Sequence, residues 1–521
     1  MKKTTLLLTF SLVLVLIGAC KDVPKNELPM QPVNLANTYK EAYRPQYHFS
    51  PQEKWMNDPN GLVYHQGVYH LFYQYYPDDI VWGPMHWGHA VSKDMVYWEH
   101  KPIALFPDEH GYIFSGSAVV DKENSSGFGT MENPPLVAIF TYHLSEGEEA
   151  GRNDYQTQGI AYSLDNGDSW AKYGGNPVIP NSGIKDFRDP KVFWNNKINK
   201  WTMLLVAGDH LQIWDSDNLK EWEKVSEFGH TQGAHGGVWE CPDMFPLKVE
   251  GTDEEKWVLL ISINPGAPNG GSGTQYFVGD FDGKRFTTDQ QKPRWIDWGT
   301  DNYAGVTYNN IPNGDRIFIG WMSNWQYARD TPTKKWRSAM TVPRKLSLKK
   351  IGDKHELINY PLKSLDTLLQ TQLSKQLTIG GMEKDSVSFD HFNQTQVKFK
   401  TLARNFMLSF KNTKGEETVI HFDGKNSKVV LDRTASGNKD FQVDFGKTPH
   451  YMPVDNLPEG LLEIRILIDW SSVELFVNGG QYVMTDQIFP TENYSLLELQ
   501  NTSEEETTFR EFTISTIKSI W

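Results

Sequence analysis

Hydrophobic and polar residues alternate in short runs from about residue 44 onward, and Gly, Pro, Asn and Asp separate one run from the next. This pattern predicts short β-strands. The clearest example is 61–73, which predicts two strands joined by a tight turn at Gln66-Gly67. Before residue 360, no segment has the period of a helix longer than three turns. Further strand pairs are expected at 136–142 with 159–163, 191–193 with 201–206, and 257–263 with 276–280.

A polar turn followed by an aromatic residue recurs four times in this region. The aromatic residues lie 52 to 72 positions apart, about the length of a four-stranded blade with its loops. The period therefore predicts a β-propeller of roughly five blades over 44–355, although such hairpins also recur in other all-β folds. The four units are Ser92 to Trp98, Ser163 to Trp170, Ser216 to Trp222 and Asp282 to Phe286.

The last third of the chain predicts a second all-β body. Residues 361–370 have leucines at helical spacing, which indicates a short helical connector within a linker over 356–375. Over 376–521, evenly spaced strands with period-two alternation are typical of a β-sandwich. This body has few unusual polar clusters, so we interpret it as a stabilising or carbohydrate-facing module. Its expected strands are 397–399, 406–410, 419–422, 429–432, 462–469, 473–477, 482–485 and 509–517.

The first twenty residues predict export. Two lysines precede an apolar run over 6–17, which is too short for a bilayer core of ~30 Å and fits a signal peptide. The run ends in Gly18-Ala19-Cys20, which resembles a bacterial lipobox. We therefore expect a lipoprotein signal peptide over 1–20 that is cleaved before Cys20, leaving Cys20 to carry the lipid. An ordinary signal peptide with a chance cysteine is the alternative.

The residues that follow Cys20 predict a tether to a membrane. Residues 21–43 contain several Pro and Asn and lack an apolar period, which indicates a flexible segment. Lys21 follows Cys20 where an Asp could stand, and by resemblance to Gram-negative sorting this favours the outer membrane. We therefore expect an exported lipoprotein on the periplasmic or cell-surface face of that membrane.

Composition excludes several classes of function. The 521 residues carry a formal net charge of -14, which argues against a nucleic-acid partner. Aromatic residues make up 13% of the chain, too many for a disordered protein. The two cysteines cannot build a disulfide framework, and Cys241 is left alone once Cys20 carries a lipid.

The first acidic motif is Trp55-Met-Asn57-Asp58-Pro59. Proline restricts the backbone of the residue before it, so the Asp58 carboxylate can be held rigidly at a strand end. The flanking Trp55 indicates a pocket, whereas the alternative is a surface turn.

Two further motifs follow at Arg188-Asp189-Pro190 and Trp239-Glu240-Cys241. We expect Arg188 to keep Asp189 ionised by lowering its pKa, and the pair could bind vicinal sugar hydroxyls. The apolar neighbours of Glu240 would favour its protonated form, as a general acid requires. A salt-bridged turn and a buried strand-end Glu are the alternatives.

Together the three motifs supply what glycoside cleavage requires, namely an ionised carboxylate, a protonated carboxyl and a partner for sugar hydroxyls. In order and spacing they resemble glycoside hydrolase family 32, the family of invertases, levanases and inulinases. The resemblance covers about 44–521 and implies a five-bladed propeller followed by a β-sandwich. Other segments similar to the family are 72–77, 82–89, 114–118, 320–325, 343–344 and 469–476.

The resemblance implies a role for each acidic residue. Asp58 matches the nucleophile that attacks the anomeric C2 of a fructofuranosyl unit, Glu240 the acid/base, and Asp189 the transition-state stabiliser. The implied reaction on fructan or sucrose is double displacement with retention, needs no cofactor, and places the Asp58 and Glu240 carboxyls about 5–5.5 Å apart. Positions that match the family's fructose pocket are Asn57, Gln74, Trp82, Phe114, Ser115, Arg188 and Trp325.

Other functions remain open beside this one. Fructosyl transfer to a sugar shares the covalent intermediate, and a non-catalytic glycan-binding lipoprotein would also suit the aromatic content. Residues 163–170 fit the Asp box of sialidases, but no arginine cluster accompanies it. His86 and His89 have no third ligand in sight, so we expect no metal site there. Levan-type and inulin-type linkages, and exo or endo attack, all fit the motifs.

Overall fold

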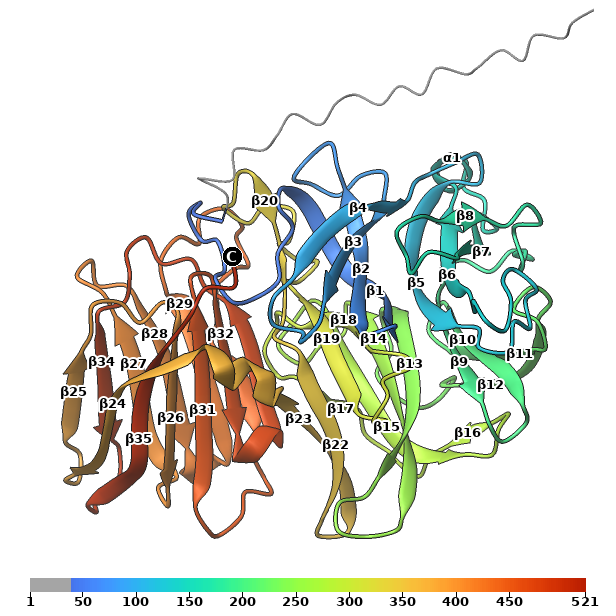
Figure 1. Ribbon diagram of the computed structural model, residues 1–521. Helices are drawn as coiled ribbons and strands as arrows, with labels where there is room; N and C mark the ends of the chain where they lie inside the picture. Colours follow the sequence, from blue (N-terminus) through green and yellow to red (C-terminus); the bar gives the residue numbers. More distant parts are fainter. Residues whose placement is uncertain (1–38) are drawn as a thin grey trace, which may run out of the picture. The chain divides into compact units, whose positions relative to one another are not determined.

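Five mainly antiparallel sheets form the first body of the chain, and two larger sheets form the second (Figure 1). The computed structural model describes residues 39–521, which form one compact unit. The expected signal peptide, Cys20 and most of the expected tether lie outside the described residues. Within residues 39–521, no helix is long and apolar enough to cross a membrane.

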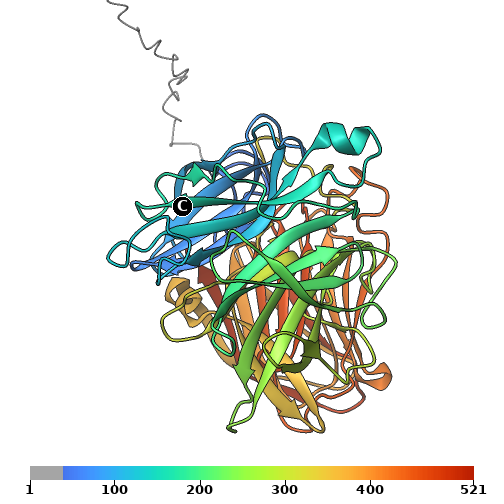
Figure 2. The same cartoon turned by 90° about the vertical axis from the view of Figure 1, so that its right-hand side faces the viewer.

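The five sheets are the blades of the propeller expected over 44–355, which confirms that fold class. Blades 1 and 2 hold β1 (Lys54–His65), β2 (Val68–Tyr76), β3 (His86–Ser92) and β4 (Glu99–Leu105), then β5 (Tyr112–Val120), β6 (Leu136–His143), β7 (Gln156–Ser163) and β8 (Ala171–Lys172). Blade 3 holds β9 (Phe187–Asn195), β10 (Lys200–Ala207), β11 (Leu211–Ser216) and β12 (Glu223–Phe228). The short helix α1 (Ser145–Glu149) projects from the propeller in Figure 2.

Blades 4 and 5 complete the ring. Blade 4 holds β13 (Val238–Lys248), β14 (Glu255–Asn264), β15 (Gly273–Phe281), β16 (Phe286–Thr287) and β17 (Arg294–Trp295). Blade 5 holds β18 (Tyr303–Thr307), β19 (Arg316–Met322), β21 (Ala339–Met340), β22 (Arg344–Ile351) and β23 (Lys354–Pro361). The innermost strands β1, β5, β9, β13 and β18 pack against one another in that order, and β18 packs back on β1. β20 (Trp336–Arg337) pairs with β1 in parallel and so fastens the end of the propeller to its start.

The local predictions for the propeller are confirmed. β1 and β2 pair across Gln66 and Gly67, whose φ angles of 45° and 85° suit the tight turn. The three other expected pairs are β6 with β7, β9 with β10 and β14 with β15. Each repeated polar turn lies between the third and fourth strand of blades 1 to 4. Ser92 shows the turn's function, because its hydroxyl accepts the backbone N–H of Met95 at 2.8 Å.

The second body is the expected β-sandwich. Its strands form two six-stranded sheets whose inner faces share one apolar core. One sheet holds β24 (Leu369–Ile379), β35 (Thr507–Ile517), β26 (Thr395–Thr401), β31 (Leu462–Asp469), β32 (Ser472–Val477) and β33 (Tyr482–Gln487). The other holds β25 (Lys384–Ser388), β34 (Leu496–Asn501), β27 (Asn405–Lys411), β28 (Glu417–Asp423), β29 (Lys428–Ala435) and β30 (His450–Pro453). Two short 3-10 helices, η3 (Gly424–Asn426) and η4 (Asn478–Gly480), lie in its turns.

The connections at both ends of the propeller are shorter than the sequence pattern indicates. β23 and β24 occupy most of the stretch expected as a linker, so only residues 362–368 connect the two bodies, with the 3-10 helix η2 (Lys363–Leu368) among them. At the start, Tyr39 is buried and stacks on Trp521 with ring centroids 3.8 Å apart. The last residues of the expected tether therefore belong to the folded body, because their aromatic side chains find apolar partners there.

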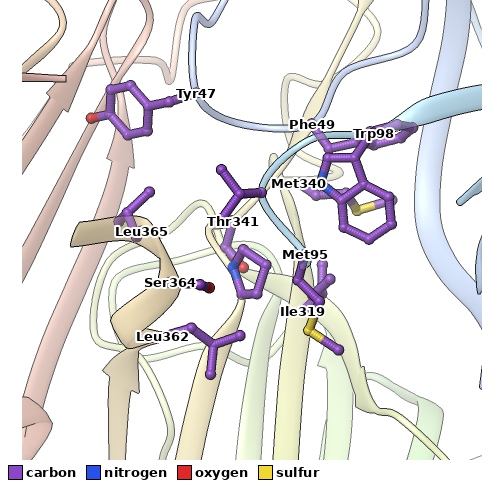
Figure 3. Close-up of a pocket in the computed structure, with 12 residues that line it drawn as sticks. Tyr47, Phe49, Met95, Trp98, Ile319, Met340, Thr341, Leu362, Ser364 and Leu365 are labelled. Carbon is purple, nitrogen blue, oxygen red and sulfur yellow. The ribbon is translucent and has the colours of Figure 1, made fainter. Parts of the chain in front are cut away.

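Buried charges join the propeller to the sandwich. Arg344 has no exposed surface in its side chain and donates to Asp297 at 3.0 Å and to Glu474 at 2.5 Å. His48 lies between Asp469 (2.8 Å) and Glu474 (3.1 Å). A crevice beside this junction, lined by Phe49, Trp98 and Leu365 among others, has a volume of about 10 Å³ and has room for about one water (Figure 3). It is too small for a sugar.

Candidate active site

Each innermost strand of the propeller is interrupted by a β-bulge. The pairing register shifts beside Asp58 in β1, Ser115 in β5, Asp189 in β9, Cys241 in β13 and Ala304 in β18. A bulge turns a side chain out of the regular alternation of its strand. The acidic motifs therefore lie within strands, where the sequence pattern indicated turns and strand ends, because the bulge supplies the irregular backbone that a turn would have supplied.

The bulges bring the expected site residues into one pocket. Its volume is about 540 Å³, within the range of ligand sites. All ten residues expected in the catalytic set and the fructose pocket line it: Asn57, Asp58, Gln74, Trp82, Phe114, Ser115, Arg188, Asp189, Glu240 and Trp325. Eight further residues that the sequence analysis did not single out complete the wall: His143, Glu148, Gln156, Asp186, Asn264, Gln326, Arg329 and Asp330.

Asp58 is a partly buried carboxylate with a donor on each oxygen. Ser115 Oγ donates to Oδ2 at 2.6 Å, and Asn57 Nδ2 donates to Oδ1 at 3.0 Å. Burial raises the pKa of Asp58, and the nearby charge of Glu240 raises it further, while the donors from Ser115 and Asn57 oppose both effects. The Ser115 and Asn57 donors therefore favour the ionised form, which is the form that a nucleophile needs.

Glu240 is held by one donor on each oxygen. Arg188 Nη2 donates to Oε1 at 2.9 Å, and the hydroxyl of Tyr303 donates to Oε2. Arg188 also binds Asp186 at 2.7 Å, so its guanidinium is fixed between two carboxylates. Burial would lower the pKa of Arg188, but the surrounding carboxylates raise it, so Arg188 remains a cation. Glu240 thus has a fixed orientation with one face toward the pocket.

Asp189 differs from the expectation drawn from its neighbour Arg188. The guanidinium turns toward Glu240 and Asp186, and its Nε lies 4.0 Å from Asp189 Oδ2. Burial raises the pKa of Asp189 to about 7, with the charge of Arg188 opposing and those of Glu240 and Asp58 adding to the rise. The expected lowering was wrong, because burial and two neighbouring carboxylates outweigh one arginine.

Cys241 joins the two aspartates. Its backbone N–H donates to Asp189 Oδ2 at 3.0 Å, and its Sγ lies 3.4 Å from Asp58 Oδ2 and 3.6 Å from Asp189 Oδ2. Cys241 and Asp189 both have positive φ, 45° and 65°, which is costly for residues other than glycine. The fold stabilises this strained backbone, and the arrangement of the aspartates depends on it.

Aromatic and amide side chains form the rest of the wall. Trp55 Nε1 donates to Asn57 Oδ1 at 2.7 Å, which fixes the amide that binds Asp58. Gln74 Nε2 donates to Asn60 Oδ1 at 2.7 Å, so its position is likewise set from behind. Trp82 meets Phe114 edge to face with ring centroids 6.0 Å apart. The pocket thus combines polar groups at its floor with apolar faces at its mouth, a combination suited to sugars.

Some residues that form or support the site carry no signal in the sequence. Tyr303 lies in an ordinary apolar strand, and only the fold brings it to Glu240, 63 positions away. Asp186 could have been noticed from its place two residues before Arg188. Arg329 could not, since it lies in a polar turn segment.

The side chains of His86 and His89 have different hydrogen-bond partners. His86 Nδ1 bonds to the Pro84 carbonyl at 2.9 Å, whereas His89 Nε2 bonds to His70 at 3.1 Å. Within residues 39–521, one group of possible ligands lies elsewhere, on the surface, at His210, Glu227 and His230. Lys224 already pairs with Glu227 there at 2.8 Å.

Sequence comparison matches nearly the whole described chain to one family. The family model described as "Glycosyl hydrolases family 32 N-terminal domain" matches residues 48–361. The model described as "Glycosyl hydrolases family 32 C terminal" matches residues 364–516. A levanase of Bacillus subtilis is 48% identical over 93% of this chain and 72% of its own length. An extracellular exo-inulinase of Aspergillus awamori is 42% identical over 88% of this chain and 92% of its own.

Solved structures agree with the sequence matches. The exo-inulinase of Aspergillus awamori superposes with a TM-score of 0.84 at 39% identity, over 93% of this chain and all of that one. A fructofuranosidase variant of Schwanniomyces occidentalis, complexed with fructosylnystose, superposes with a TM-score of 0.82 at 32% identity, over 92% of this chain and 99% of that one.

Proposed function

Because the chain belongs to glycosyl hydrolases family 32, we propose that this glycoside hydrolase releases fructose from β-fructans, and from sucrose, by double displacement with retention. The relatives named levanase, exo-inulinase and invertase support this substrate class. The observation that carries the proposal is the meeting of Asp58, Asp189 and Glu240 in one pocket of sugar size.

In the first step, an Asp58 oxygen attacks the anomeric C2 of the terminal fructosyl unit. The bond from C2 to the glycosidic oxygen breaks, and the proton of Glu240 passes to that oxygen, so that the rest of the substrate leaves as an alcohol. The contacts of Ser115 and Asn57 support an ionised Asp58. A fructosyl ester on Asp58 results.

In the second step, Glu240 takes a proton from water, and the water oxygen attacks C2. The ester bond breaks, fructose leaves with retained configuration, and Asp58 is again a carboxylate. Asp189 would bind ring hydroxyls during both steps, and its backbone donor from Cys241 supports a fixed position for it. Arg188 and Tyr303 would hold Glu240 in line with the leaving oxygen.

Substitution of the nucleophile tests the proposal. We expect Asp58→Asn to retain the fold, because the amide occupies nearly the same volume, and to lose about 10³-fold or more of kcat on levan, inulin and sucrose. Fructose release measured beside Asp108→Asn, a carboxylate outside the pocket, provides the comparison. Near wild-type rates in Asp58→Asn would refute the assignment.

Fructosyl transfer is the second candidate, since the same ester could react with a sugar hydroxyl. Product analysis in concentrated sucrose separates the two. Free fructose as the main product supports hydrolysis, whereas accumulating oligosaccharides longer than sucrose would assign the chain to transfer.

We further propose that the protein is exported and held at a membrane by a lipid on Cys20. The lipobox-like segment and the extracellular relatives support export. Radiolabelled palmitate should label the wild-type chain in a Gram-negative host and leave Cys20→Ser unlabelled. Equal labelling of both would refute lipidation at Cys20.

A further inference from the structure

Arg329 is a wall residue of the pocket with no assigned task. Its guanidinium lies over the ring faces of Trp82 and Trp325, at 5.6 and 5.9 Å from their centroids. Both tryptophans line the pocket, Trp82 beside Phe114 and Trp325 beside Trp55. Arg329 thus lies at the exposed end of the aromatic wall, whereas Asp189 is buried and Asp58 and Glu240 are half-buried.

The backbone of Arg329 is fixed although its side chain is exposed. The buried guanidinium of Arg337 donates to the Arg329 carbonyl, and through its other nitrogen to the Thr331 carbonyl at 2.7 Å. The Ala328 N–H donates to the Asn324 carbonyl at 2.8 Å. A turn anchored on both sides of Arg329 holds its Cα at a constant place on the rim.

The donors of Arg329 are unused within the folded body. Among residues 39–521, its guanidinium has no ion pair and no hydrogen bond, and its neighbours at the pocket are the rings of Trp82 and Trp325. Arginine has five N–H donors in one plane, a geometry that binds adjacent oxygens in pairs. Because none of these donors is paired within residues 39–521, the guanidinium beside Trp82 and Trp325 has them free for whatever occupies the mouth of the pocket.

We propose that Arg329 is a specificity-determining contact for the sugar unit that leaves, the neutral polyhydroxylated unit next to the scissile bond. This inference rests on the proposed function, which places the departing unit at the pocket mouth. Pairs of sugar hydroxyls accept from the guanidinium, and Trp82 and Trp325 line the same part of the pocket. Arg329 takes no part in bond breaking.

The test compares a substrate that has a leaving sugar with one that lacks it. Levan oligosaccharides have a fructosyl unit on the leaving side, whereas methyl β-D-fructofuranoside has only a methyl group there. We expect Arg329→Ala to lower kcat/KM on levan oligosaccharides about five- to tenfold, the upper part of the net range for one ordinary hydrogen bond. The change should be mainly in KM, and kcat/KM on the methyl fructoside should stay within about twofold. Arg329→Lys, which keeps the charge without the planar fork, should recover only part of the loss.

Two controls separate this role from a structural one. Arg285→Ala removes an exposed arginine in the turn before β16 and should change neither substrate. The inhibition constant for fructose, which occupies only the inner part of the pocket, should be equal in wild type and Arg329→Ala. Equal losses of kcat/KM on both substrates, or no loss on levan oligosaccharides, would overturn the inference. The proposed function would still stand in that case, because the wild type is active. A wild type that hydrolyses neither substrate would instead overturn the proposed function, and this inference with it.

Discussion

The substitution Ser115→Ala tests most directly whether hydrogen-bond donors keep Asp58 ionised. The Ser115 hydroxyl donates to Asp58 Oδ2 at 2.6 Å, a short hydrogen bond of the kind formed with a charged acceptor. Ser115 is buried, so no bulk water would replace the lost donor freely. Such bonds are worth about 1.5–3 kcal/mol. Since burial and Glu240 already raise the pKa of Asp58, losing an opposing donor should raise it further.

The consequence should appear in the pH dependence of activity. The nucleophile must be ionised, so the acidic limb of kcat/KM for sucrose should move to higher pH in Ser115→Ala, by about one to two pH units. The profile is measured by fructose release between pH 3 and pH 9. Ser117→Ala deletes a hydroxyl two residues along the same strand that binds the Pro190 carbonyl, so its acidic limb should stay in place. A limb in Ser115→Ala that stays in place, or moves to lower pH, would refute the reasoning.

Three further predictions concern the thiol, the domain junction and its histidine. Burial raises the pKa of the Cys241 thiol, and the carboxylates of Asp189, Asp58 and Glu240 raise it further. Iodoacetamide at pH 8 should therefore alkylate Cys241 only after denaturation. Fast alkylation of the native enzyme would contradict this. Arg344→Met should lower the free energy of urea unfolding by about 3–5 kcal/mol, because it leaves Asp297 and Glu474 buried without their partner. Arg152→Ala removes an exposed ion pair and should leave the stability unchanged. Equal stabilities of the two variants would argue against the junction network. Burial alone would lower the pKa of His48, but Asp469 and Glu474 raise it to about 9. The contribution of protonated His48 to the folding stability is therefore complete below about pH 6.5 and is lost as the pH rises through 9. His48→Gln should flatten the fall in unfolding free energy across this window, and an unchanged slope would contradict the assignment.

Much of the fold could be predicted because its signals are local. The alternation in 61–73 and the turn at Gln66-Gly67 require only neighbouring residues. The polar turns that begin at Ser92 and Ser163 recur because each closes the third and fourth strands of a blade. The β-sandwich followed from period-two alternation in the same way.

The electrostatics of the site could not be predicted, because they depend on contacts distant in sequence. Arg188 follows Asp186 and precedes Asp189 in the chain, yet its strongest new partner is Glu240, 52 positions on. Tyr303 reaches Glu240 from another blade. The bulges that aim Asp58 and Asp189 into the pocket also left no clear sequence signal, since proline after each Asp indicated a turn as readily as a strand.

Covalent trapping tests the central claim most directly. Glu240→Ala should still allow Asp58 to attack an aryl β-D-fructofuranoside, whose leaving group needs no proton, while water attack on the ester lacks its base. Rapid quenching, proteolysis and mass spectrometry should then find one fructosyl group, attached to Asp58. A fructosyl group on another residue, or rapid turnover to fructose of inverted configuration with no adduct, would contradict double displacement through Asp58.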